Sequence, residues 1–150
     1  MSGKPLAAQN PDFVAVTTRF IMDMPIAAFL GFSITDIAPG YLEVTQPYRP
    51  ELCFQGRVFQ AGPIGTLADF AGAGACFSML PPGWLAATAD YTVKLLSPAE
   101  GDTLVARGRV VQCGRTLSVA ASEVFAVNEG RETLCATALV TARNFAARST

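Results

Sequence analysis

The stretch from Ala61 to Leu80 is the feature that most constrains the fold, because its twenty residues carry only one charge, the carboxylate of Asp69. Its apolar content predicts a helix that lies in the core of the domain. Burying an ionised carboxylate in such a helix is costly unless hydrogen bonds or water reach it. A perturbed acid in a buried cleft is typical of functional sites, although a hydrogen bond to a neighbouring backbone amide would also explain it. Asp69 is therefore the first candidate for a catalytic residue.

The size and composition predict one domain that associates with other copies. The chain has 150 residues, of which 51% are hydrophobic and only 15% charged, against a usual charged fraction of about a quarter. So little charge indicates that a second subunit covers part of the apolar surface. We expect a single domain over residues 1–150, with a helical segment at about 10–30 and a core at about 31–145.

The charged and nucleophilic residues exclude several classes of function. The net charge is −1 and the eleven Lys and Arg residues are scattered, which argues against a nucleic-acid partner. The chain has no histidine, so Ser-His-Asp and Cys-His catalysis and His-containing zinc sites are excluded. Its four cysteines lack paired ligand spacing and are interpreted as small buried hydrophobes. We expect no metal and no cofactor, and acid–base chemistry that depends on carboxylates, Tyr, Lys or the backbone.

No segment predicts export or a membrane span. Residues 1–11 lack the apolar core of a signal peptide. The 61–80 run is long enough to cross a bilayer, but Asp69, Pro63 and four glycines argue against that interpretation. We therefore expect a cytoplasmic protein without a membrane partner.

Local patterns predict one order of helices and strands. A helical segment at 10–30 would begin with Asn10 or Asp12 as its N-cap and break near Pro25. Residues 48–60 are expected to form a loop, and Pro63 suits the first turn of the 61–80 helix. Alternation and turn residues predict six strands: Phe32–Ala38, Tyr41–Pro47, Leu85–Leu96, Thr103–Cys113, Thr116–Val127 and Glu132–Phe145.

The apolar helix carries small residues that would let a sheet approach closely. Ala68, Ala71, Gly72 and Ala75 make one side of it nearly flat. An antiparallel sheet curled around this central helix fits the order of the elements, which predicts an α+β fold.

Several short motifs occur in a fixed order. The turn Val58–Gly62 (Val-Phe-Gln-Ala-Gly) precedes Leu67-Ala68-Asp69, and four further pieces follow: Leu95–Ala99, Gly101-Asp102, Gly114–Leu117 and Glu123-Val124. Over about residues 20–145 the chain resembles the hotdog-fold thioesterase superfamily, specifically the phenylacetate-degradation (PaaI)-like acyl-CoA thioesterases. In that family a His stands where this chain has Gln60, and a Gly where it has Ala61.

The resemblance implies hydrolysis of an acyl- or aryl-CoA thioester. Asp69 would be the general base or the nucleophile, and the amides of Ala61 and Gly62 would hold the oxyanion. Gln60 could donate a hydrogen bond to the substrate carbonyl in place of the family His, or could instead cap the helix or face solvent. Thr88 aligns with a residue that positions water in relatives, although Thr is also simply a good strand residue.

The resemblance also implies a homodimer or homotetramer, in which the turn of one subunit meets the helix acid of another. The candidates for contacts with the CoA phosphates are three cations: Arg57, Lys94 and Arg115. Three aromatic residues could line an acyl pocket or belong to the dimer core: Phe54, Phe59 and Tyr91.

Other functions stay open at this stage. Loss of the family His favours a catalytically impaired hotdog protein that binds an acyl-CoA-like ligand. Hotdog hydratases pair an acid with a His, which this chain lacks. A purely structural partner protein is a further alternative.

Overall fold

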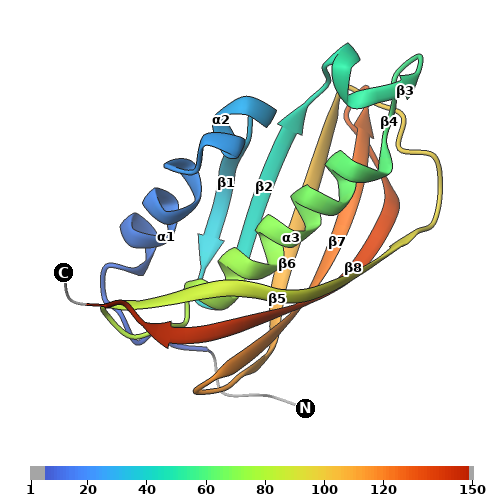
Figure 1. Ribbon diagram of the computed structural model, residues 1–150. Coiled ribbons are helices and arrows are strands. Elements are labelled where there is room, and N and C mark those ends of the chain that lie inside the picture. The colour runs from blue at the N-terminus through green and yellow to red at the C-terminus, as the bar shows by residue number, and fades with distance from the viewer. Residues whose placement is uncertain (1–5, 149–150) are drawn as a thin grey trace.

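One antiparallel sheet with a long helix across one of its faces makes up the molecule (Figure 1). The computed structural model describes residues 6–148. The helices are α1 (Phe13–Met22), α2 (Pro25–Leu30) and α3 (Ala61–Phe77), with a short 3₁₀ turn at Pro50–Leu52. The strands are β1 (Ser33–Ala38), β2 (Tyr41–Pro47), β3 (Cys53–Gln55), β4 (Val58–Phe59), β5 (Trp84–Leu95), β6 (Thr103–Cys113), β7 (Leu117–Asn128) and β8 (Arg131–Ala146).

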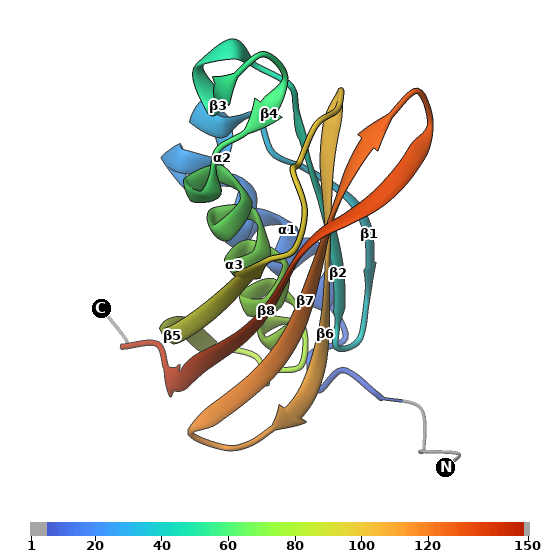
Figure 2. The same cartoon turned by 90° about the vertical axis from the view of Figure 1, so that its right-hand side faces the viewer.

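The main sheet has six strands in the order β1-β2-β6-β7-β8-β5, so β1 and β5 form its edges. Figure 2 shows the sheet from its side, with α3 along one face and α1 beyond it. The α+β architecture with a central helix is the one that the resemblance implies, and the six long strands lie within a residue or two of their expected positions.

The helix α3 lies unusually close to the sheet, because glycines face each other where they meet. A Cβ added at Gly108 of β6 would overlap the backbone carbonyl of Ala71. A Cβ added at Gly72 would lie 2.7 Å from a methyl carbon of Val140 in β8. Ala68, Ala71 and Ala75 are fully buried. The flat side predicted from the small residues is therefore the side that the sheet covers.

The end of α3 differs from the expectation. The helix ends at Phe77 and not at Leu80, because residues 78–80 tighten into turns in which the N–H groups of Met79 and Leu80 donate to carbonyls three residues earlier. The hydroxyl of Ser78 donates to Ala75 and accepts the N–H of Gly40 in the β1–β2 turn. A tertiary contact of Ser78 thus accompanies the end of the helix.

The expected loop at 48–60 was wrong in part, because it contains the short hairpin β3–β4. Its turn includes Gly56, whose φ of 54° lies in the left-handed region that favours glycine. Strands of two or three residues are too short to show the alternation by which strands are recognised. The hairpin delivers the chain directly to the first turn of α3.

The N-terminal helical segment breaks at Pro25 as expected, giving α1 and α2. Asp12 occupies the N-cap position without a side-chain cap, whereas the side chain of Asn10 accepts the N–H of Asp12 at 2.9 Å. Phe20 of α1 stacks on Phe77 of α3 with ring centroids 4.1 Å apart. This stacking fixes α1 against α3.

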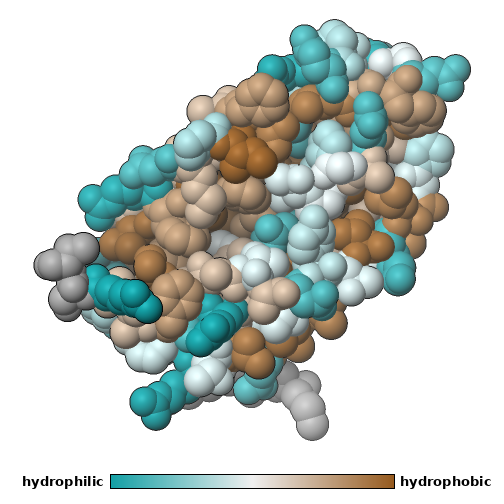
Figure 3. All heavy atoms as spheres, in the orientation of Figure 1, coloured by the Kyte–Doolittle hydropathy of each residue, from teal (hydrophilic) through white to brown (hydrophobic). Residues whose placement is uncertain are grey.

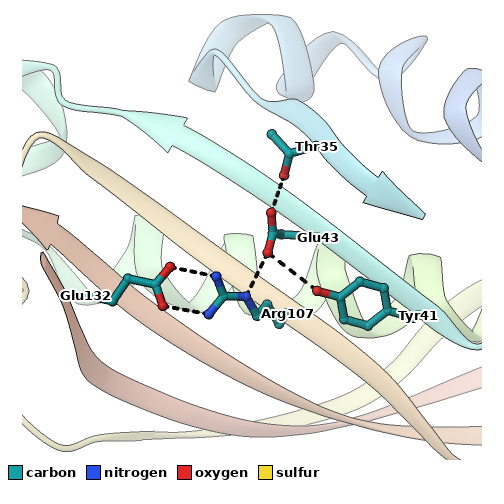
Figure 4. Close-up of polar contacts among 5 residues, drawn as sticks. All are labelled: Thr35, Tyr41, Glu43, Arg107 and Glu132. Atoms are coloured by element: carbon teal, nitrogen blue, oxygen red, sulfur yellow. Dashed lines mark hydrogen bonds and ion pairs between the residues drawn. The ribbon is translucent and has the colours of Figure 1, made fainter. Parts of the chain in front are cut away.

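The outer face of the sheet, opposite α3, carries a network centred on Arg107 (Figure 4). Its guanidinium donates two hydrogen bonds to Glu132, at 2.6 and 2.8 Å, and one to Glu43 at 2.7 Å. These hydrogen bonds hold the pKa of Glu132 below its ordinary value. Burial raises the pKa of Glu43, but hydrogen bonds from Thr35 and Arg107 outweigh burial and lower it overall. The network joins β2, β6 and β8 and lies on the other side of the sheet from Asp69.

Within residues 6–148, no helix combines the length and the apolar character needed to cross a membrane.

Candidate active site

Asp69 lies near the middle of α3, half-buried on the stripe of the helix that the sheet leaves uncovered. The hydroxyl of Thr88, on β5, donates a hydrogen bond of 2.8 Å to its Oδ1 atom. The two residues that the resemblance implies for the base and for positioning water are therefore in direct contact. Because Thr88 engages only Oδ1, the Oδ2 atom is left for another proton donor.

Burial raises the pKa of Asp69 above its ordinary value, and the hydrogen bond from Thr88 opposes that shift without cancelling it. A carboxylate with a raised pKa is a stronger base than an ordinary aspartate. A carboxyl group whose pKa is perturbed by desolvation and which lines a cavity is a candidate for a functional site.

Asp69 and Thr88 open onto a cavity of about 260 Å³. Besides these two residues, its walls are apolar and come from four places: α1, the α1–α2 link, α3 and β5. The residues are Phe20 and Ile21, Met24, Phe70, Ala73 and Gly74, and Ala86 and Ala87, respectively. Sequence reasoning missed the α1 wall, because residues of α1 have the helical spacing of ordinary core residues. Figure 3 shows apolar side chains gathered over α1, α2 and the adjoining part of α3.

The start of α3 is a second polar feature. Gln60 is the N-cap residue and its side chain makes no capping hydrogen bond; instead it donates to the backbone carbonyl of Cys53 at 3.3 Å. The prediction that Gln60 could cap the helix with its side chain is therefore wrong. The first N–H groups of a helix have no acceptor within the helix. Those of Ala61 and Gly62 lie at an exposed end, where the positive pole of the helix dipole favours an anion.

A hollow of about 490 Å³ lies beside this helix start. Gln60, Ala61, Phe54 and Phe59 line it. Phe59 is only 2% exposed and packs in the core, whereas Phe54 is 67% exposed. The two aromatic residues thus reach the same hollow, one from the core and one from the surface.

Asp69 and the helix-start amides do not form one site within a single chain. They are eight residues apart on α3, which corresponds to about 12 Å along the helix axis. A single carbonyl group cannot contact both the carboxylate and the amides at that separation. The chain therefore presents two half-sites, an acid half at Asp69 and Thr88 and an amide half at Gln60, Ala61 and Gly62.

The remaining candidates are dispersed. Arg57, on the β3–β4 turn, pairs with Asp102 and lies over the ring of Tyr48. Lys94 is exposed on β5. Arg115 lies between β6 and β7, at the end of the sheet opposite the β3–β4 hairpin (Figure 1), so it does not join Arg57 in one cation cluster.

Tyr91 lines neither of the two cavities. It is 44% exposed on β5, and a Cβ at Gly65 would lie 3.7 Å from its ring. Its ring therefore rests on α3, on the exposed edge of the sheet.

In the described part of the chain, no three His, Cys, Asp or Glu side chains are grouped so that they could hold a metal ion.

Comparison with known sequences finds one matching family and a related protein. The family model described as "Thioesterase superfamily" matches residues 53–141, a range that includes both half-sites. A protein of Halobacterium salinarum, provisionally named an esterase, is 36% identical over 114 residues, which are 73% of this chain and 75% of the relative.

Solved structures show the same architecture. A thioesterase family protein from Silicibacter pomeroyi superposes with a TM-score of 0.87 and 31% identity, over 89% of this chain and 98% of its own. The E. coli PaaI protein from the phenylacetic acid degradation operon superposes with a TM-score of 0.80 over 95% of this chain and 100% of its own. At 24% identity, the second comparison shows the fold alone.

Proposed function

The chain belongs to the thioesterase superfamily, and from that membership we propose that it hydrolyses an acyl- or aryl-CoA thioester with Asp69 as its base. The observation that carries the proposal is the contact between Asp69 and Thr88 in the wall of an otherwise apolar cavity. Thioester hydrolysis needs an activated water, and a half-buried carboxylate with one free oxygen can supply it.

In the proposed reaction, the Oδ2 atom of Asp69 removes a proton from a water molecule, whose oxygen attacks the thioester carbonyl carbon. The carbonyl oxygen becomes an oxyanion and accepts hydrogen bonds from the N–H groups of Ala61 and Gly62. The intermediate then collapses, the C–S bond breaks, and the CoA thiolate takes the proton held by Asp69. The products are a free acid and CoA. Asp69 acting directly as nucleophile, through an anhydride that water then cleaves, is the other route open to the same residue.

The separation of about 12 Å along α3 supports a site shared between two copies of the chain. The acid half-site of one copy would face the amide half-site of the other. The edge strand β5, which carries Thr88, has twelve residues and a free edge. A long uncovered edge strand is a natural place for a second chain to pair. We propose a homodimer as the smallest active unit, and a homotetramer is the larger alternative.

The experiment that tests the function is hydrolysis of a panel of acyl- and aryl-CoA thioesters by the wild-type protein and by Asp69→Asn. Loss of the thioester absorbance is the suitable readout, because thiol reagents would also detect the protein's own cysteines. We expect turnover by the wild type and a decrease of at least about 100-fold in the variant. Full activity in Asp69→Asn would refute the mechanism.

A second candidate function is binding without catalysis. It is favoured by Gln60, whose amide cannot carry a proton and whose side chain is held by the Cys53 carbonyl. Saturable binding of an acyl-CoA with no turnover of any thioester would establish this alternative.

A further inference from the structure

We propose that Ser122 is a positioning residue, which aims the Asp69 carboxylate through a hydrogen bond to the backbone of α3; this inference rests on the proposed function. Ser122 lies on β7 and is only 1% exposed. Its hydroxyl donates a hydrogen bond of 2.9 Å to the backbone carbonyl of Ala68, the residue that precedes Asp69. Within residues 6–148, no other side chain of the main sheet bonds to the backbone of α3.

The flat contact between α3 and the sheet makes this hydrogen bond important. In the register of the sheet, Ser122 lies between Gly108 of β6 and Ala138 of β8, so three small residues in a row face the helix. The side of α3 that meets them is the flat side described above. Packed helices usually hold their position because ridges of larger side chains fit into grooves. Two flat surfaces interlock less, so a directional hydrogen bond contributes more to fixing the helix.

The hydroxyl of Ser122 lies at the point of closest approach. A Cβ added at Gly72, one helical turn after Ala68, would lie 2.9 Å from the Ser122 Oγ atom. The hydroxyl is therefore enclosed by the backbone of α3. A carbonyl oxygen has two lone pairs, so that of Ala68 can accept the Ser122 hydroxyl in addition to its helical N–H partner.

The position of Ala68 determines the direction of Asp69. Consecutive residues of an α-helix point about 100° apart, so a helix that is held at Ala68 also has a fixed direction at Asp69. From another side, Thr88 of β5 donates to the Oδ1 atom of Asp69 at 2.8 Å. The acid is thus held through its backbone by β7 and through its carboxylate by β5. A rotation of α3 would draw Asp69 away from Thr88 although neither residue had changed.

No charged group shares the cavity with Asp69. The other residues that line it, from α1, the α1–α2 link, α3 and β5, are uncharged. Burial raises the pKa of Asp69, and the hydrogen bond from Thr88 lowers it. A rotation that weakened this hydrogen bond would therefore raise the pKa of Asp69 further. The contribution of Ser122 should consequently be measurable in the pH dependence of the reaction.

Ser122→Ala tests the role with little risk to folding. It removes the hydroxyl without leaving an unpaired donor, and the Ala68 carbonyl keeps its helical partner. For the best thioester substrate of the panel above, we expect kcat to fall by about fivefold, the factor for loss of one hydrogen bond. KM should change by less than about twofold, since Ser122 does not contact substrate. The acid limb of the kcat/KM profile should move to higher pH.

Ser118→Ala is the matched control on the same strand. Ser118 is also fully buried on β7, but its hydroxyl accepts a hydrogen bond from the Asn144 amide at 2.8 Å and lies 3.7 Å from the sulfur of Cys113. Its loss leaves a buried amide hydrogen without a partner, so Ser118→Ala should lower Tm at least as much as Ser122→Ala does. We expect its kcat and pH profile to stay within about twofold of the wild type.

A double-mutant cycle tests whether the effect of Ser122 passes through Thr88. In a Thr88→Val background the hydrogen bond to Asp69 is already lost, so Ser122→Ala should lower kcat by less than about twofold more. Multiplicative effects of the two substitutions, or equal kinetics of the two serine variants, would overturn the positioning role and leave the proposed function intact. Absence of turnover by the wild type on every thioester would instead overturn the proposed function.

The position of Asp69 can also be measured without substrate. In protein labelled with ¹³C-aspartate, the carboxyl signal of Asp69 is the one that is absent from Asp69→Asn. We expect this signal to titrate at higher pH in Ser122→Ala than in the wild type, and at the wild-type pH in Ser118→Ala. An unchanged titration in Ser122→Ala would refute the role of Ser122 whatever the activity of the protein.

Discussion

At the scale of single residues, burial raises the pKa of Asp69 and the hydrogen bond from Thr88 moderates that rise. The hydroxyl of Thr88 is the only contact that lowers the pKa of Asp69 against the effect of burial within the described residues. Because only one of the two carboxylate oxygens is engaged, Thr88 also fixes which oxygen faces the water. Under the proposed mechanism, Thr88 would be a positioning residue that does not contact the reacting atoms.

Replacing Thr88 by Val should therefore raise the pKa of Asp69 further, since the lowering hydrogen bond is lost. More of the carboxyl is then protonated on the acid side of the profile, so we expect kcat/KM to fall there by up to about fivefold, the factor for loss of a hydrogen bond of about 1 kcal/mol, and to fall less on the alkaline side. The pH profile of kcat/KM is the measurement. Thr88→Ser keeps the donor and should restore the profile; an unchanged profile in Thr88→Val would contradict the positioning role.

The raised pKa of Asp69 also predicts a stability effect. The native state holds this proton more tightly than the unfolded chain, so stability falls as pH rises from the ordinary aspartate value, 3.8, through the folded pKa. Asp69→Asn stays neutral and escapes this loss. We expect its Tm to exceed that of the wild type by about 1–4 °C at pH 7, with the difference vanishing near pH 3.5. A lower Tm for the variant at pH 7 would show that the carboxylate is stabilising.

Two parts of the candidate site, Asp69 and the start of α3, could be proposed from the sequence. Asp69 is the one charge in an apolar run, and the family resemblance covers both segments. Its cavity could not. Phe20 and Met24 have the spacing of core residues, and only the packing of α1 on α3 leaves space between them. The sequence likewise offers both Arg57 and Arg115 as candidates for phosphate contacts, whereas the tertiary structure places them at opposite ends of the sheet.

At the scale of elements, the approach of α3 to the sheet is set by glycines that differ in their surroundings. A Cβ at Gly72 would lie within 3 Å of Val140 and of the Ser122 hydroxyl, whereas a Cβ at Gly65 meets nothing closer than 3.7 Å. The small residues predicted a flat helix side from the sequence alone. The sequence could not predict which of these glycines lies against the strands, because that depends on the register between α3 and the sheet.

These two glycines form a matched pair in one helix. We expect Gly72→Ala to lower the free energy of unfolding by about 1–3 kcal/mol, because the added methyl group must push β8 or α3 aside. Gly65→Ala should raise it by about 0.5–1 kcal/mol through helix propensity. Denaturant unfolding of the two variants beside the wild type measures both. Similar behaviour of the pair would indicate that α3 can shift away from the sheet at little cost.

At the scale of the whole molecule, the two half-sites lead to a prediction about mixed assemblies. Ala61→Pro removes one oxyanion donor at the first helical position, where proline is tolerated. Alone it should lower kcat by about 10²–10³-fold, as Asp69→Asn does by losing the base. In mixed dimers one site regains an intact acid and intact amides from different chains. Mixing equal amounts of the two variants, after subunit exchange, should therefore restore about a quarter of wild-type activity.

No recovery in the mixture, with exchange verified by labelled subunits, would place the whole site within one chain. Light scattering supplies the accompanying control, because a monomer at micromolar concentration would exclude a shared site of any geometry.

The fold of the whole molecule followed from the sequence because its pieces agree: apolar periodicity, turn residues and the small-residue helix all lead to one antiparallel sheet around α3. The oligomeric state could not be predicted in the same way. The edge of β5 exposes the same backbone N–H and C=O groups as any other edge strand, so the sequence does not show which edge pairs with a second copy.

Under the proposed mechanism, one rigid helix carries both the acid and the oxyanion donors, and this limits the protein concentrations at which the enzyme is active. Each α3 serves two reactions, giving the base to one and the oxyanion donors to the other. Dilution would then separate every active centre into inert parts while leaving each chain folded, so specific activity would depend on protein concentration. Substrate, by bridging the two halves, would hold the copies together and extend activity to lower concentrations.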